Sequence, residues 1–235
     1  MKLLFQLKEL CVYYKKSCIC QSVSLEVDHG EEICLLGRNG VGKTTLLKSI
    51  MRLLPSRSGS IIFDGLDIVH LKPNQVAKLG IGYVPQGRMI FPNLTVLENL
   101  RLGTAAQKDK IKAIPELVFD YFPLLKERLQ QRGGSLSGGE QQMLAIGRAL
   151  SSLPKLILMD EPSEGLSAGV TQGLIKILKK LSQEANLTIF LVEQNLDMAL
   201  EIATRGYIME KGHIVAQGKA AELQHDDIVK SYLAV

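Results

Sequence analysis

The sequence has no tryptophan, and aromatic residues make up only 5% of its 235 residues. A surface that stacks nucleic-acid bases needs aromatic side chains, so this scarcity weighs against one. No apolar run approaches the ~20 residues that span a bilayer. Residues 1–10 include Lys2, Lys8 and Glu9 where a signal peptide would be apolar. We therefore expect a cytosolic protein that can still dock on a membrane partner.

An excess of charge of one sign is also lacking. The chain has 28 Lys and Arg against 24 Asp and Glu, a formal charge of +4, and the two signs are interleaved. Interleaved charges are typical of a solvated surface, whereas nucleic-acid binding favours a basic patch. We therefore expect no nucleic-acid partner.

Cysteine is scarce and confined to one end of the chain. Cys11, Cys18, Cys20 and Cys34 all lie in the first 34 residues. No second Cys or Cys/His cluster would complete a tetrahedral zinc site. Thiols of a cytosolic chain stay reduced, so we expect structural thiols without metal or disulfide.

The order of apolar patterns predicts the fold class. Hydrophobic residues make up 46% of the chain, enough for the core of one domain. Short apolar strands alternate with helical patterns, which is typical of an α/β fold with a largely parallel sheet. We expect strands at 23–27, 32–37, 60–63, 80–85, 156–160 and 188–192, a hairpin at 206–210 and 213–217, and helices at 43–54, 140–151, 170–181, 196–203 and 220–233.

A mostly helical insertion interrupts this alternation after residue 87. Residues 94–102 and 110–129 have helical spacing, and Pro115 and Pro123 interrupt the second of these segments. We expect this block to pack as a helical subdomain on the α/β core.

A phosphate-binding loop follows the expected strand 32–37 and opens the helix at 43–54. Glycines at its bends would let backbone N–H groups surround phosphate oxygens, and the helix N-terminus adds partial positive charge. Lys43 would reach the β- and γ-phosphates, and Thr44 would bind Mg²⁺. The segment comprises Gly37, Arg38, Asn39, Gly40, Val41, Gly42, Lys43 and Thr44, with Thr45 next in the helix.

An acidic pair at the end of the buried strand 156–160 would supply the carboxylates that a phosphate-binding site needs for Mg²⁺ and for catalysis. Asp160 ends the strand and Glu161 follows it. A carboxylate at this place holds Mg²⁺ through its water shell. We expect Glu161 to polarise the attacking water as a general base.

A second helix N-terminus carries an anion-binding pattern. Ser137, Gly138, Gly139 and Glu140 open the helix at 140–151. The serine and the glycine amides would form another anion site. One chain cannot easily bring both this site and its own phosphate-binding loop to one phosphate.

These three motifs, in their order along the chain, resemble those of ATP-binding cassette (ABC) ATPases. The resemblance extends over essentially the whole chain. The resemblance implies a single domain over 1–235: an α/β P-loop NTPase fold with a RecA-like core, an N-terminal antiparallel β-subdomain and a helical subdomain with the signature motif inserted at 87–148. It also implies that Ser137–Glu140 close on ATP held by a partner cassette.

The resemblance assigns further residues. Gln86 matches the glutamine that contacts Mg²⁺ or the lytic water and reports to the membrane partner. Tyr14 lies where the family stacks an aromatic ring on adenine, and neighbouring Tyr13 is an alternative. Residues 163–167 match the D-loop, which crosses the interface between cassettes.

One position departs from the family pattern. Gln194 stands where the family usually has a switch histidine. A glutamine can hydrogen-bond a γ-phosphate but cannot carry the charge of an imidazolium. Either hydrolysis tolerates this change, or this site is the weaker one of a heterodimer.

Residues 192–195 and 80–88 resemble the ATPases of bacterial importers for branched-chain amino acids, urea and short amides. That resemblance implies ATP and Mg²⁺ as cofactors and a position at the cytoplasmic face of the inner membrane. It also implies transmembrane permease subunits, an external substrate-binding protein and a second ATPase chain, with a homodimer as the alternative. Two other functions are a lipid or polysaccharide exporter ATPase and a cassette ATPase acting on DNA or ribosomes. The lack of long coiled coils and of a second cassette argues against the latter.

Overall fold

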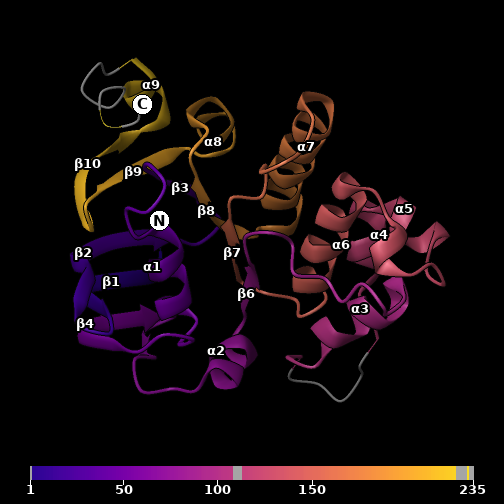
Figure 1. The fold of residues 1–235 in the computed structure, drawn as a ribbon, viewed down its shortest axis with the longest axis horizontal. Helices are drawn as coiled ribbons and strands as arrows, with labels where there is room; N and C mark the ends of the chain where they lie inside the picture. Colours follow the sequence, from indigo (N-terminus) through magenta and orange to yellow (C-terminus); the bar gives the residue numbers. More distant parts are fainter. Residues whose placement is uncertain (1, 108–112, 226–231, 233–235) are drawn as a thin grey trace.

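The computed structural model describes residues 2–107, 113–225 and 232. In these residues the chain forms two sheets and a group of helices packed beside them (Figure 1). The smaller sheet has the strand order β2-β1-β4-β5, and the larger has the order β10-β9-β3-β8-β7-β6. The predicted α/β class with an antiparallel N-terminal part is confirmed.

The smaller sheet is antiparallel throughout its pairings. Sequence patterns missed β1 and gave only parts of β2 and β4. The cause lies in the register of β1, which shifts between Leu7 and Leu10 and again before Val12. These bulges, one of them at Glu9 with φ 47°, break the two-residue alternation that marks a half-buried strand. The strands are β1 (Leu3–Tyr14), β2 (Ser17–Asp28), β4 (Ser56–Phe63) and β5 (Leu66–Asp67).

The larger sheet is parallel from β9 to β6, and β10 pairs antiparallel with β9 at one edge. Every residue of β7 and β8 is buried, as continuous apolar runs predict for strands covered on both faces. The carboxyl ends of the central strands therefore meet at one edge. The strands are β3 (Glu32–Leu36), β6 (Ile81–Val84), β7 (Leu156–Asp160), β8 (Thr188–Glu193), β9 (Arg205–Glu210) and β10 (His213–Lys219).

Outside the inserted block, the described residues form five helices that pack beside the two sheets. The helix α1 (Lys43–Ile50) ends before the expected residue 54. The helix α7 (Ala168–Ala185) is longer than expected, and α8 (Leu196–Ile202) is close to expectation. The short α2 (Pro73–Leu79) was missed, because Val76 is its only buried residue and no apolar stripe marks it. The last helix, α9 (Ala220–His225), begins as expected, and most of the expected segment 226–233 lies outside the described residues.

The inserted block contains α3 (Val96–Thr104), α4 (Glu116–Tyr121), α5 (Pro123–Glu127) and α6 (Gly138–Leu150). These helices gather on the side away from the antiparallel sheet (Figure 1). The expected helix 110–129 is two short helices that meet at Phe122, before Pro123, and its residues 110–112 lie outside the described part. Leu100, Val118, Leu125 and Leu144 belong to one buried apolar cluster, so the helices share a core.

Candidate functional site

The loop between β3 and α1 has the backbone that a phosphate-binding loop needs. Gly40 and Gly42 have φ values of 81° and 116°, in the region that favours glycine. The side chain of Lys43 is buried, and its Nζ donates to the carbonyls of Gly37 at 2.7 Å and Arg38 at 3.1 Å. The main chain of the loop therefore holds the Lys43 ammonium group in place.

A cavity of about 410 Å³ lies over this loop. All of its lining residues were predicted as site residues except Ile19 of β2, which no chemical motif marks. Tyr14, at the end of β1, lines this cavity, whereas Tyr13 does not and instead faces Arg57, whose guanidinium carbon lies 4.9 Å from the ring centre. The lining comprises Tyr14, Ile19, Asn39, Gly40, Gly42, Lys43, Thr44, Thr45, Gln86 and Glu161.

Three predicted residues have other places in the loop. The backbone at Gly37 passes so close to β9 that an added Cβ would lie 2.5 Å from the carbonyl oxygen of Met209. Val41 packs against the apolar cluster under the antiparallel sheet, and Arg38 is exposed. These residues shape the loop and do not line the cavity.

Asp160 and Thr44 form the candidate metal position. The Thr44 hydroxyl donates to Asp160 Oδ1 at 3.1 Å, and the Tyr83 hydroxyl donates to Asp160 Oδ2 at 3.4 Å. Burial raises the pKa of Asp160 above its usual range, and the hydrogen bond from Thr44 opposes that shift. Sequence reasoning missed Tyr83, which lies on β6 beside Asp160; parallel pairing of β6 with β7 explains its place.

Glu161 has a strained backbone and two polar partners. Its φ is 47°, which is rare for a residue with a side chain. Its N–H donates to the carbonyl of Val192 at 2.8 Å. Its carboxylate lies 3.3 Å from Lys43 Nζ and accepts from Gln86 Nε2 at 3.2 Å. Strain at a polar residue that projects into a cavity is typical of a functional position.

Gln194 and residues 137–140 lie outside this cavity. Gln194 is exposed and lines an adjoining polar cavity with Asn39 and Glu161. Ser137 caps α6 through a reciprocal pair: Ser137 N–H donates to Glu140 Oε2 at 2.8 Å, and Glu140 N–H donates to Ser137 Oγ at 3.4 Å. Gly138 and Gly139 form the first turn. Residues 137–140 therefore do not line the cavity of the phosphate-binding loop in the same chain.

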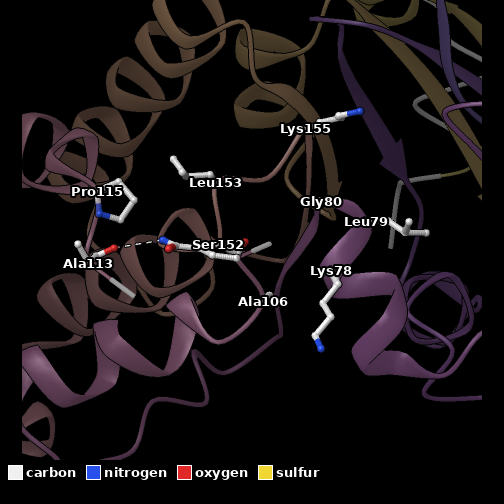
Figure 2. Close-up of a pocket in the computed structure, with 10 residues that line it drawn as sticks. Lys78, Leu79, Gly80, Ala106, Ala113, Pro115, Ser152, Leu153 and Lys155 are labelled. Atoms are coloured by element: carbon white, nitrogen blue, oxygen red, sulfur yellow. Dashed lines mark hydrogen bonds between the residues drawn. The ribbon is translucent and has the colours of Figure 1, made fainter. Parts of the chain in front are cut away.

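A second cavity of about 410 Å³ lies at the opposite edge of the sheet, where β6 and β7 begin (Figure 2). None of the described residues that line it carries a carboxylate, and Lys155 is paired with Asp64 at 2.5 Å. In Figure 2 the side chains of Lys78 and Lys155 extend away from each other. The described lining residues therefore bring no pair of opposite charges together.

The fold and the site together define a P-loop ATPase of the cassette type. The chain matches the ABC transporter family over residues 20–164, and it belongs to that family. It is the ATP-binding and ATP-hydrolysing component of a transport system, as its motifs predict.

Named relatives agree with this assignment. The chain is 45% identical over 216 residues to the high-affinity branched-chain amino acid transport ATP-binding protein BraG of Pseudomonas aeruginosa, with 92% of each chain covered. It is 37% identical over 224 residues to the probable branched-chain amino acid transport protein LivF of Archaeoglobus fulgidus, with 94% of this chain and 95% of LivF covered. It is 35% identical over 229 residues to the lipopolysaccharide export protein LptB of Escherichia coli, covering 95% of this chain and 93% of LptB.

Solved structures show the same fold. The ADP form of MJ1267, an ATP-binding cassette of an ABC transporter, has a TM-score of 0.85 and 27% identity, with 99% of this chain and 98% of MJ1267 covered. A dimeric bacterial cassette, MJ0796, has a TM-score of 0.81 and 26% identity, with 92% of this chain and 99% of MJ0796 covered. In the described part of our chain, helices fall short of the length and apolarity needed to cross a bilayer.

Proposed function

We propose that this chain powers an importer of branched-chain amino acids or of related small polar nutrients such as urea. The observation that carries its chemistry is the meeting of Lys43, Glu161 and Gln86 over the phosphate-binding loop. The assignment of the chain to an importer is supported by its 45% identity to BraG, against 35% to the export-system protein LptB.

The residues at the carboxyl edge of the sheet fit the triphosphate of ATP with Mg²⁺. Hydroxyl, carboxylate and amide oxygens suit this hard cation, and Thr44, Asp160 and Gln86 supply them. Bound Mg²⁺ would neutralise charge on the phosphates. Lys43 and the loop amides would hold the β- and γ-phosphates, and Tyr14 would stack on adenine.

Glu161 is the proposed general base. It points into the cavity from the end of β7, where it can orient a water and accept its proton. Gln194, in the adjoining cavity, would donate to the γ-phosphate through its amide. Gln86 would sense the occupant through its contact with Glu161.

We propose that the ATP site is completed by a partner cassette. Ser137, Gly138, Gly139 and Glu140 would close on nucleotide held by the other chain, because they do not line their own cavity. The dimeric MJ0796 cassette supports a pair of cassettes as the working unit. We favour a different sister ATPase as the partner, with a homodimer as the alternative.

The assembly would lie at the cytoplasmic face of the inner membrane. Residues 87–148 would act as a helical subdomain that passes closure of the cassettes to transmembrane permease subunits. An external substrate-binding protein would supply the nutrient, so the substrate would be chosen by other chains.

The experiment replaces the proposed general base, Glu161, in the assembled transporter. We expect Glu161→Gln to bind ATP with near-normal affinity and to lose at least about a hundredfold in turnover, because the base is removed and the shape is kept. Glu184→Gln, on the exposed face of α7, is the matched control and should hydrolyse normally. Wild-type turnover by Glu161→Gln would overturn the assignment. Uptake of labelled leucine or urea into vesicles would then decide the nutrient.

A further inference from the structure

Glu193 is a buried carboxylate that the proposed chemistry leaves without a role. It is the last residue of β8, and only 2% of it is exposed. That strand lies between β3, which leads into the phosphate-binding loop, and β7, which ends at Asp160. Glu193 therefore stands between the elements that carry the candidate site.

The two oxygens of Glu193 serve two different loops. Oε1 accepts the Ser163 backbone N–H at 3.1 Å and the Ser163 hydroxyl at 2.7 Å. Oε2 accepts the N–H of Gln194 at 3.2 Å and, at a longer 3.5 Å, that of Asn195. One oxygen thus binds the segment after β7, and the other binds the segment after β8.

This arrangement suits an ionised carboxylate. A buried charge is costly unless it is hydrogen-bonded, and here three backbone N–H groups and one hydroxyl surround it. Burial raises the pKa of Glu193, and these donors oppose the shift. Within residues 2–107, 113–225 and 232, no Lys, Arg or His pairs with it.

Further hydrogen bonds fix the two segments that Glu193 joins, the one after β7 and the one after β8. Glu161 donates its backbone N–H to Val192, so the 161–163 segment is tied to β8 at two points. Asn195 caps α8, its Oδ1 accepting from the N–H of Met198 at 3.0 Å. Gln194 therefore lies between two anchored residues while its own side chain stays exposed beside Glu161.

We propose that Glu193 is a positioning residue that fixes Gln194 relative to Ser163, while Glu161 is held separately by its own N–H bond to the Val192 carbonyl. Hydrolysis then depends on Glu193 through Gln194, because both Glu193 oxygens accept from backbone N–H groups and the Ser163 hydroxyl. This inference rests on the proposed function, since it assigns Gln194 to the γ-phosphate.

The test uses Glu193→Gln, which keeps the shape but leaves one accepting oxygen. Its amide nitrogen must face backbone N–H donors, so one of the two loops is released. In the assembled transporter we expect turnover to fall about tenfold and the KM for ATP to change less than about twofold. Ser163→Ala should give a smaller fall in the same direction. Ser163→Thr, which keeps the hydroxyl, should restore most of the turnover.

A double-variant cycle separates positioning from a merely structural role. In a Gln194→Ala background, Glu193→Gln should cost little further turnover, because its effect passes through Gln194. If Glu193→Gln lowers turnover by the same factor in the wild-type and Gln194→Ala backgrounds, the proposal is overturned. Wild-type turnover in Gln194→Ala or in Glu193→Gln would also overturn it. If Glu193→Gln does not fold, the Ser163 pair decides: equal loss in Ser163→Ala and Ser163→Thr overturns the proposal. Loss of turnover in Glu161→Gln, measured first, shows that the proposed function stands on its own.

Discussion

The Lys43 ammonium lies 3.3 Å from the Glu161 carboxylate, with 4% and 10% of the two side chains exposed. This ion pair joins the phosphate-binding loop to the segment after β7. Gln86 touches the same carboxylate from the loop after β6. Three strand ends are therefore joined by the side chains that an ATP γ-phosphate would meet, and nucleotide would compete with Glu161 for the lysine.

The first prediction concerns Lys43. We expect Lys43→Ala to weaken ATP binding at least about tenfold, since a charge-assisted contact to phosphate is lost. Isothermal titration calorimetry would measure the affinity. Lys176→Ala, on the exposed face of α7, is the control and should bind normally. Unchanged affinity in Lys43→Ala would contradict the assignment of this cavity to phosphate.

A second prediction separates the two neighbouring tyrosines. Tyr14 is 58% exposed and lines the cavity, whereas Tyr13 faces Arg57. Loss of base stacking costs ~1–3 kcal/mol, so Tyr14→Ala should weaken ATP binding by about 5- to 150-fold. Tyr13→Ala should change it less than twofold. The reverse order in a fluorescent-nucleotide titration would move the adenine site to Tyr13.

A third prediction tests the packing of the helical block. A Cβ added to Gly103 of α3 would lie 1.9 Å from the carbonyl oxygen of Arg148 on α6. Gly103→Ala should therefore destabilise the fold by about 1–3 kcal/mol, the usual cost of overpacking. At Gly173 of α7, an added Cβ would have no atom of the described residues within 4 Å. Gly173→Ala should therefore stabilise the fold by about 0.5–1 kcal/mol. Urea unfolding of the two variants would compare their free energies of unfolding.

The fourth prediction concerns thiol reactivity. All four cysteines are free. Hydrogen bonds from Ser58 and from the Ser22 backbone lower the pKa of Cys11, so more of it is thiolate at neutral pH. Burial raises the pKa of Cys20 and of Cys34 to about 12, which keeps both protonated.

Alkylation of the native protein should therefore reach Cys11 and Cys18 and spare Cys20 and Cys34. The rate at Cys11 should rise with a midpoint below that of an ordinary thiol, because its hydrogen bonds lower its pKa. Peptide mass mapping at several pH values would measure both. Modification of Cys34 in the folded chain at the rate of Cys11 would contradict the structure.

Local patterns predicted the elements whose burial is uniform. The strands β7 and β8 are apolar along their length because both faces are covered, and α6 begins at a serine that caps it. Elements with mixed surroundings were missed. Bulges disrupt the alternation of β1, and α2 buries only Val76, so neither leaves a clear period in the sequence.

Local motifs were enough to predict the phosphate-binding loop, the acidic pair at the end of β7 and the Ser-Gly-Gly-Glu segment before α6, because each motif is set by neighbours a few positions away. The three-dimensional packing was needed to show that Tyr14 and not Tyr13 lines the cavity, that Tyr83 contacts Asp160, and that Glu193 joins Ser163 to Gln194. The order of parallel strands brings these residues together from distant parts of the chain. Strand order depends on how the whole core packs, which no local pattern encodes.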